Sequence, residues 1–148
     1  MIFLRVTFLL ILSSILTSFL SVPITTASYS IWLASIDMPI TLNYFIASLI
    51  HDWFNLGITI FLFTLMGFLI AFSVTTLILN NFKIKLINAP FSYAIAGSFC
   101  IALILYLSVS LLFETQIIAG NRTLMGYFLH ILAGFIGGYF FGYFLKKM

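Results

Sequence analysis

Charged side chains are scarce in this sequence. Six Lys or Arg and three Asp or Glu make up 6% of its 148 residues, whereas charged residues make up about a quarter of an ordinary soluble domain. The hydrophobic share is 64% and the mean hydropathy is +1.27. This composition excludes a soluble globular domain and predicts an integral membrane protein, with the lipid bilayer as its partner. A nucleic-acid-binding surface is also excluded, because the basic residues are scattered over loops and chain ends.

Cysteine is nearly absent as well. Cys100 is the single cysteine and lies inside an apolar run, so the chain has no disulfide framework, thiol pair or zinc-binding cysteine cluster. No nucleophile motif or phosphate-binding loop accompanies the few carboxylates. We therefore expect no enzyme activity, no metal ion and no cofactor.

Four apolar runs are long enough to cross a membrane, whose hydrocarbon core needs about 20 helical residues. They cover residues 6–22, 56–79, 91–113 and 123–145. The connections after the second and third runs are short, which favours antiparallel packing of neighbouring helices. The sequence therefore predicts an all-α integral membrane protein with a single domain over residues 1–148, in which four transmembrane helices form an antiparallel bundle.

The first run is the shortest, and residues 1–27 also fit a signal peptide. Arg5 supplies a positive n-region, residues 6–20 an apolar segment, and residues 25–27 the small side chains of a cleavage site. The apolar segment is at the long end for a signal peptide, which has about 7–15 such residues. We expect this run to be a membrane helix that ends at Pro23, and cleavage stays open as the alternative.

Basic residues predict the orientation, since Lys and Arg next to membrane spans favour the cytoplasmic side. If both termini are cytoplasmic, only Arg122 lies on the opposite side. The other five basic residues then share the cytoplasmic side: Arg5, Lys83, Lys85, Lys146 and Lys147. We therefore expect a multi-pass protein of the bacterial inner membrane with both termini in the cytoplasm.

Residues 40–53 connect the first two runs and repeat apolar side chains every three or four positions. This spacing predicts an amphipathic helix at the outer membrane surface. Asn55 and Gly57 favour a break between that helix and the second span. The alternative is that the segment extends the second span outward without a break.

The last run carries a ladder of small residues. Glycine recurs at four-residue steps, with a histidine on the missing step: Gly126, His130, Gly134, Gly138 and Gly142. Such a ridge lets membrane helices approach closely, so we expect it to contact another helix, in the same chain or in a second copy. Our first functional prediction is therefore a non-catalytic homo-oligomer or a subunit of a larger membrane complex, joined through this glycine ridge.

His130 lies inside a predicted span, where an ionisable side chain needs either a partner or a task. The structural interpretation is a neutral imidazole that is hydrogen-bonded to a neighbouring helix. The alternative function is a small proton-coupled transporter or channel in which His130 relays protons. Four further residues would form its polar outer mouth: His51, Asp52, Glu114 and Arg122.

The two histidines suggest a third function, a haem- or quinone-associated redox subunit. Ligation of one haem by His51 and His130 requires both imidazoles at one depth in the membrane. The sequence places His51 at the outer boundary and His130 deeper by on the order of 10 Å, from the rise per helical residue. This mismatch in depth argues against a haem site.

Overall fold

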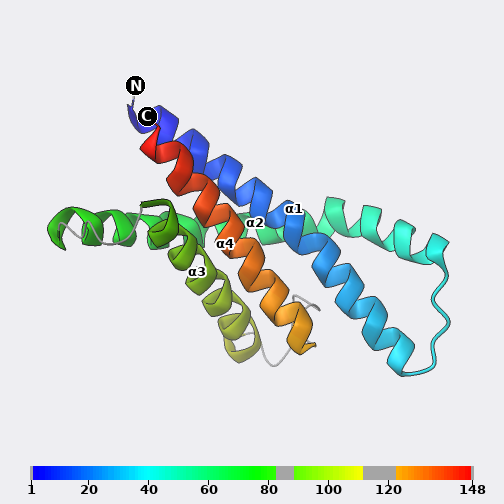
Figure 1. Ribbon diagram of the computed structural model, residues 1–148. Helices are drawn as coiled ribbons and strands as arrows, with labels where there is room; N and C mark the ends of the chain where they lie inside the picture. Colours follow the sequence, from blue (N-terminus) through cyan, green and yellow to red (C-terminus); the bar gives the residue numbers. More distant parts are fainter. Residues whose placement is uncertain (1, 83–88, 112–122, 148) are drawn as a thin grey trace.

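The computed structural model describes residues 2–82, 89–111 and 123–147 (Figure 1). These ranges contain four long α-helices and no strand. The helices are α1 (Ile2–Ser35), α2 (Leu42–Phe82), α3 (Ala89–Leu111) and α4 (Leu124–Lys146). Each is long and apolar enough to cross a membrane, which confirms the prediction of an all-helical chain with four potential spans.

Each helix packs against at least two others. α4 lies between α1 and α3, and α2 crosses behind these three helices at a steep angle (Figure 1). α2 contacts α1 and α3, and the most extensive interface is the one between α3 and α4. The start of α1 lies beside the end of α4 (Figure 1). Side chains from all four helices therefore meet in one interior.

Pro23 does not end the first helix, so that prediction is wrong. α1 continues through Pro23 to Ser35. A proline removes one backbone donor, but in membrane helices neighbouring helices and Ser or Thr side chains satisfy the freed groups. The group that Pro23 leaves without its helical donor is the carbonyl of Phe19, four residues earlier. Just after Pro23, the hydroxyls of Thr25 and Thr26 lie within hydrogen-bond distance of carbonyls one turn earlier in the same helix. Both threonines are buried and helical, instead of part of a loop.

Many hydroxyl groups of α1 face the other helices. Nine of its Ser and Thr side chains are buried, and we call them the hydroxyl face: Ser13, Ser14, Thr17, Ser18, Ser21, Thr25, Thr26, Ser28 and Ser30. Seven of them lie on one stripe of the helix, and Thr26 and Ser30 lie beside it. Ser13 Oγ donates to the carbonyl of Gly137 on α4, at 2.7 Å. Ser18 Oγ donates to the carbonyl of Gly57 on α2, also at 2.7 Å. The hydroxyl face therefore ties α1 to both of its neighbours, because in hydrocarbon such groups need partners inside the protein.

We expect Ser18→Ala to lower the free energy of unfolding by about 0.6 kcal/mol, the average for a hydrogen bond between membrane helices. The substitution removes the bond between α1 and α2. Ser14→Ala is the matched control, because Ser14 Oγ bonds to the carbonyl of Leu10 in its own helix. Unfolding of both variants by SDS in mixed micelles measures the difference. Equal losses would show that the bond between helices adds nothing.

The segment 40–53 is not a separate helix. It joins the second span in the continuous helix α2, so the alternative of an unbroken extension is correct. The side chain of Asn55 donates to the carbonyl of His51 one turn earlier, at 2.9 Å. Gly57 leaves room for Val22 of α1, which would lie 3.6 Å from a Cβ at this position. The expected break is therefore a place where the helix continues and α1 approaches closely.

Only part of the apolar face predicted for residues 40–53 packs against other residues of the chain. Leu49 and Trp53 pack against the core. Leu42 and Ile50 are exposed, by 73% and 50%. α2 has 41 residues and is therefore about 61 Å long. This exceeds the thickness of about 40–45 Å of a whole bilayer, so α2 must lie tilted or project beyond the membrane.

Candidate functional site

The glycine ridge of α4 packs against helices of the same chain. A Cβ built on Gly134 would lie 2.6 Å from the carbonyl oxygen of Gly97 on α3. A Cβ on Gly138 would collide with the carbonyl of Tyr93, and one on Gly142 would lie 2.7 Å from Cα of Pro90. A second copy of the chain has no access to these glycines unless α3 is displaced.

His130 lies on the same ridge and is fully buried, with 1% of its surface exposed. It borders a small cavity to which every helix contributes, including Ser21 of α1, Thr64 of α2 and Leu105 of α3. The cavity volume is ≈ 10 Å³. A single water needs about 10–15 Å³, so the cavity is at the lower limit for one water molecule. His130 therefore occupies the common interior of the four helices.

Both ring nitrogens of His130 have hydrogen-bond partners. Nδ1 lies 2.7 Å from the carbonyl oxygen of Gly126, one turn earlier in α4. Nε2 lies 3.0 Å from Oγ1 of Thr25 on α1. A carbonyl oxygen only accepts hydrogen bonds, so Nδ1 carries a proton. The protonation of Nε2 therefore decides whether the ring is neutral or positively charged.

The hydroxyl of Thr25 can serve His130 in either protonation state. Its oxygen also lies 3.0 Å from the carbonyl oxygen of Ser21. When the imidazole is neutral, the Thr25 hydroxyl donates to Nε2. When the imidazole is protonated, Nε2 donates to Thr25 Oγ1 and the hydroxyl turns to donate to Ser21. Rotation of one hydroxyl thus leaves the ring and its partner hydrogen-bonded in both states.

A second titratable group is held by the next residue of α1. The hydroxyl of Thr26 donates to Oδ2 of Asp52 on α2, at 2.8 Å. The other oxygen, Oδ1, lies 3.7 Å from Nδ1 of His51. The Asp52 side chain is 29% exposed and that of His51 is 73% exposed. We call five residues the polar line: His51, Asp52 and Thr26, which contact one another near the surface, and Thr25 and His130, which contact each other in the interior. The two groups are joined only by the backbone of α1, because the hydroxyls of Thr25 and Thr26 each lie near a carbonyl of that helix.

The difference in membrane depth between the two histidines stays a prediction. Asp52, the neighbour of His51, lies inside the continuous helix α2 and not at the end of a separate surface helix. His51 does not border the cavity beside His130.

Two residues of the predicted outer mouth, Glu114 and Arg122, lie outside the described residues. Within residues 2–82, 89–111 and 123–147, no three His, Cys, Asp or Glu side chains gather in a way that could hold a metal ion.

The haem hypothesis requires His130 as an axial ligand, but both of its ring nitrogens are hydrogen-bonded to protein groups. His51, the other histidine of that hypothesis, is a largely exposed side chain.

Three residues of this region carry no clear signal in the sequence. Thr25 and Thr26 follow Pro23, where the sequence predicts the end of the first helix, so they fall in a predicted loop. Gly97 is a single glycine without a four-residue repeat, although it faces Gly134. Comparison with protein families, with curated proteins and with solved structures found no match to the chain.

Proposed function

We propose that this protein is a small proton-conducting or proton-coupled membrane transporter in which His130 takes up and releases a proton. The observation that carries the proposal is the pair of hydrogen-bonding arrangements around the imidazole. A histidine that only joins two helices needs partners in one protonation state. The partners of His130 suit both states, and the change between them requires no movement of a helix.

The polar line supports a proton route to His130 from one side. Asp52 is partly exposed and is bound by Thr26, and the next residue of α1, Thr25, binds the buried imidazole. Titratable residues inside a span commonly mark proton pathways in membrane proteins. The small cavity that His130 shares with Ser21 and Thr64 has the volume at which one water can be held, and this water would be the next carrier.

We further propose an antiparallel bundle in a bacterial inner membrane, with both termini cytoplasmic. The support is that the start of α1 and the end of α4 lie at the same end of the structure (Figure 1), and these two helix ends carry Arg5 and the Lys146–Lys147 pair in the sequence. Asp52 and His51 then belong to the outer half of the protein. Assembly with further copies or subunits would use faces other than the glycine ridge, which α3 covers.

The test is proton flux into liposomes that contain the purified protein and a pH-sensitive dye. With acid outside, and with potassium and valinomycin to prevent a membrane potential, we expect the interior to acidify faster than in protein-free liposomes. Equal rates, both with and without added candidate solutes, would contradict the proposal.

We expect Thr25→Val to slow this flux about tenfold, because a buried nitrogen left without its partner costs about 1–3 kcal/mol. Valine keeps the shape of threonine but has no hydroxyl that could donate to either His130 or the carbonyl of Ser21. Thr25→Ser is the control, since it keeps the hydroxyl and should keep most of the flux. If the valine variant conducts as well as the serine variant, the Thr25 hydroxyl has no part in the transfer.

A further inference from the structure

An apolar groove of ≈ 300 Å³ runs along the outside of α4 where this helix meets α1. Leu16 of α1 forms one wall, and six residues of α4 between Phe135 and Phe144 form the other. Ile136 and Tyr139 in this wall are 41% and 45% exposed. Ligand-binding clefts start at about 300 Å³, so the groove has the volume of a small site.

The length of the groove matches one half of a bilayer. From Phe135 to Phe144, α4 rises about 14 Å at 1.5 Å per residue. The hydrocarbon core of a membrane is about 30 Å thick, so one leaflet contributes about half of that. The groove therefore extends over the depth that a single acyl chain of one leaflet occupies.

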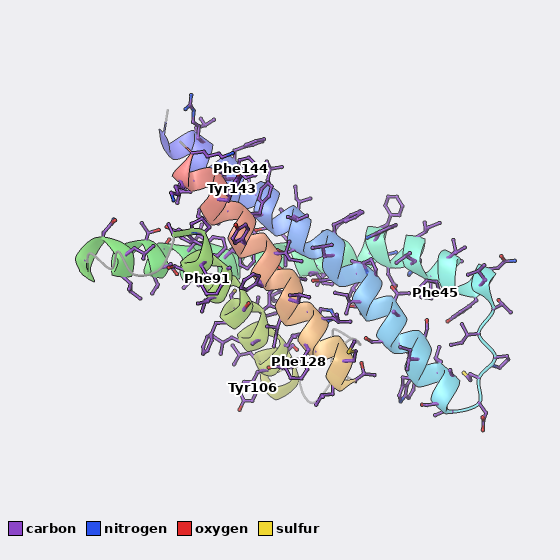
Figure 2. All side chains as sticks on the ribbon, viewed as in Figure 1. Phe45, Phe91, Tyr106, Phe128, Tyr143 and Phe144 are labelled. Atoms are coloured by element: carbon purple, nitrogen blue, oxygen red, sulfur yellow. The ribbon has the colours of Figure 1, made fainter. Side chains whose placement is uncertain are left out.

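The end of the groove is basic. Nζ of Lys147 lies 4.3 Å from the centre of the Tyr143 ring, which lines the groove. Figure 2 shows Tyr143 and Phe144 where the end of α4 meets the start of α1. Arg5 and Lys146 are exposed at this same end. The acidic residues that the structure describes, Asp37 and Asp52, lie in the other half of the chain's fold, toward the junction of α1 and α2.

We infer that this groove binds an anionic phospholipid, with one acyl chain along Leu16, Ile136 and Tyr139 and the phosphate bound by Arg5, Lys146 and Lys147. The apolar walls suit a hydrocarbon chain, and the basic side chains stand where the headgroup of that chain must lie. A zwitterionic phospholipid would fill the groove equally well and also has a phosphate, but its own ammonium group balances that charge, so it offers the three basic side chains no net negative charge. The charge at the end of the groove therefore selects the lipid.

The experiment is native mass spectrometry of the protein after equilibration with equal amounts of phosphatidylglycerol and phosphatidylcholine of identical acyl chains. We expect the wild-type protein to retain mainly phosphatidylglycerol. Each basic side chain near an anionic headgroup favours it about fivefold, so Lys146→Gln with Lys147→Gln should lower the ratio of the two lipids by more than tenfold. Lys146→Arg with Lys147→Arg keeps the charge and should keep the ratio. Equal retention of both lipids by the wild type, or an unchanged ratio in the glutamine variant, overturns the inference.

A second pair of variants tests the groove itself. Ile136→Trp fills the groove and should reduce retention of both lipids. Leu132→Trp is the matched control, because Leu132 is also exposed on α4, by 52%, but does not line the groove. If both tryptophan variants retain lipid like the wild type, the acyl chain lies elsewhere and the proposed site is wrong.

Discussion

We expect His130→Gln to reduce the proton flux of reconstituted liposomes to that of protein-free liposomes. Glutamine has a similar size and can still hydrogen-bond to Gly126 or Thr25, but its amide does not bind a proton in the accessible pH range. The substitution therefore removes titration while it keeps polar contacts between α4 and α1. The initial rate of dye acidification measures the effect.

The matched control for this experiment is Tyr93→Phe. Tyr93 is buried, and its hydroxyl lies 2.8 Å from Oγ1 of Thr76 on α2, so the variant removes another polar pair between helices. Tyr93 is not part of the polar line, and we expect the flux of this variant to stay unchanged. If His130→Gln conducts like the wild type, His130 has a structural role and the proposed relay is wrong.

The second large effect is expected on folding. Gly138→Ala should lower the free energy of unfolding by about 3 kcal/mol or more, at or above the upper end of ordinary overpacking. The added methyl group would collide with the backbone carbonyl of Tyr93 and lie 3.0 Å from Cα of Ala94. Backbone atoms cannot rotate away as a flexible side chain does, so α3 and α4 would have to separate. SDS titration followed by circular dichroism measures the loss.

Gly57→Ala is the control for this prediction. The nearest atom to a Cβ at Gly57 is 3.6 Å away, which is an ordinary contact. Alanine is favoured over glycine in a helix by about 1 kcal/mol, so we expect no loss of stability. The two variants also show whether the glycine ridge packs helices of one chain together or joins two copies of the chain. If Gly138→Ala dissociates an oligomer but leaves the monomer as stable as before, the ridge joins copies and not helices of one chain.

The last two spans could be predicted closely. The apolar runs 91–113 and 123–145 correspond to Ala89–Leu111 and Leu124–Lys146. The predicted end of the third run, residues 112–113, lies outside the described residues. In the fourth run the apolar stretch and the helix begin and end within one residue of each other, so composition alone sets these boundaries. The predicted boundaries of the first two spans are wrong at Pro23 and Gly57, because both helices continue through these residues. Proline and glycine often end helices in water. In hydrocarbon no water satisfies a broken backbone, which favours continuing the helix through such residues.

The sequence predicts His130 as a member of the candidate site, but not the residues of other helices that contact it. His130 stands out because it is an ionisable residue in an apolar run, and the four-residue period shows which residues share its face. Its partner Thr25 could not be found, because it lies beyond Pro23 in a segment expected to be a loop. A period identifies the face of a helix but not the helix opposite, and for this reason Gly97 was not recognised as the contact of Gly134.

The unequal lengths of the helices have a consequence for where the protein can reside. α4 has 23 residues and is about 35 Å long, whereas α2 is about 61 Å long. A bilayer that matches α4 cannot match α2 without tilt, and each ångström of mismatch costs a fraction of a kcal/mol. In a thicker membrane α2 would stand more upright, which would act on its contacts with α1 at Gly57 and Thr26. We therefore expect membrane thickness to influence which bilayers suit this protein and how α1 and α2 pack.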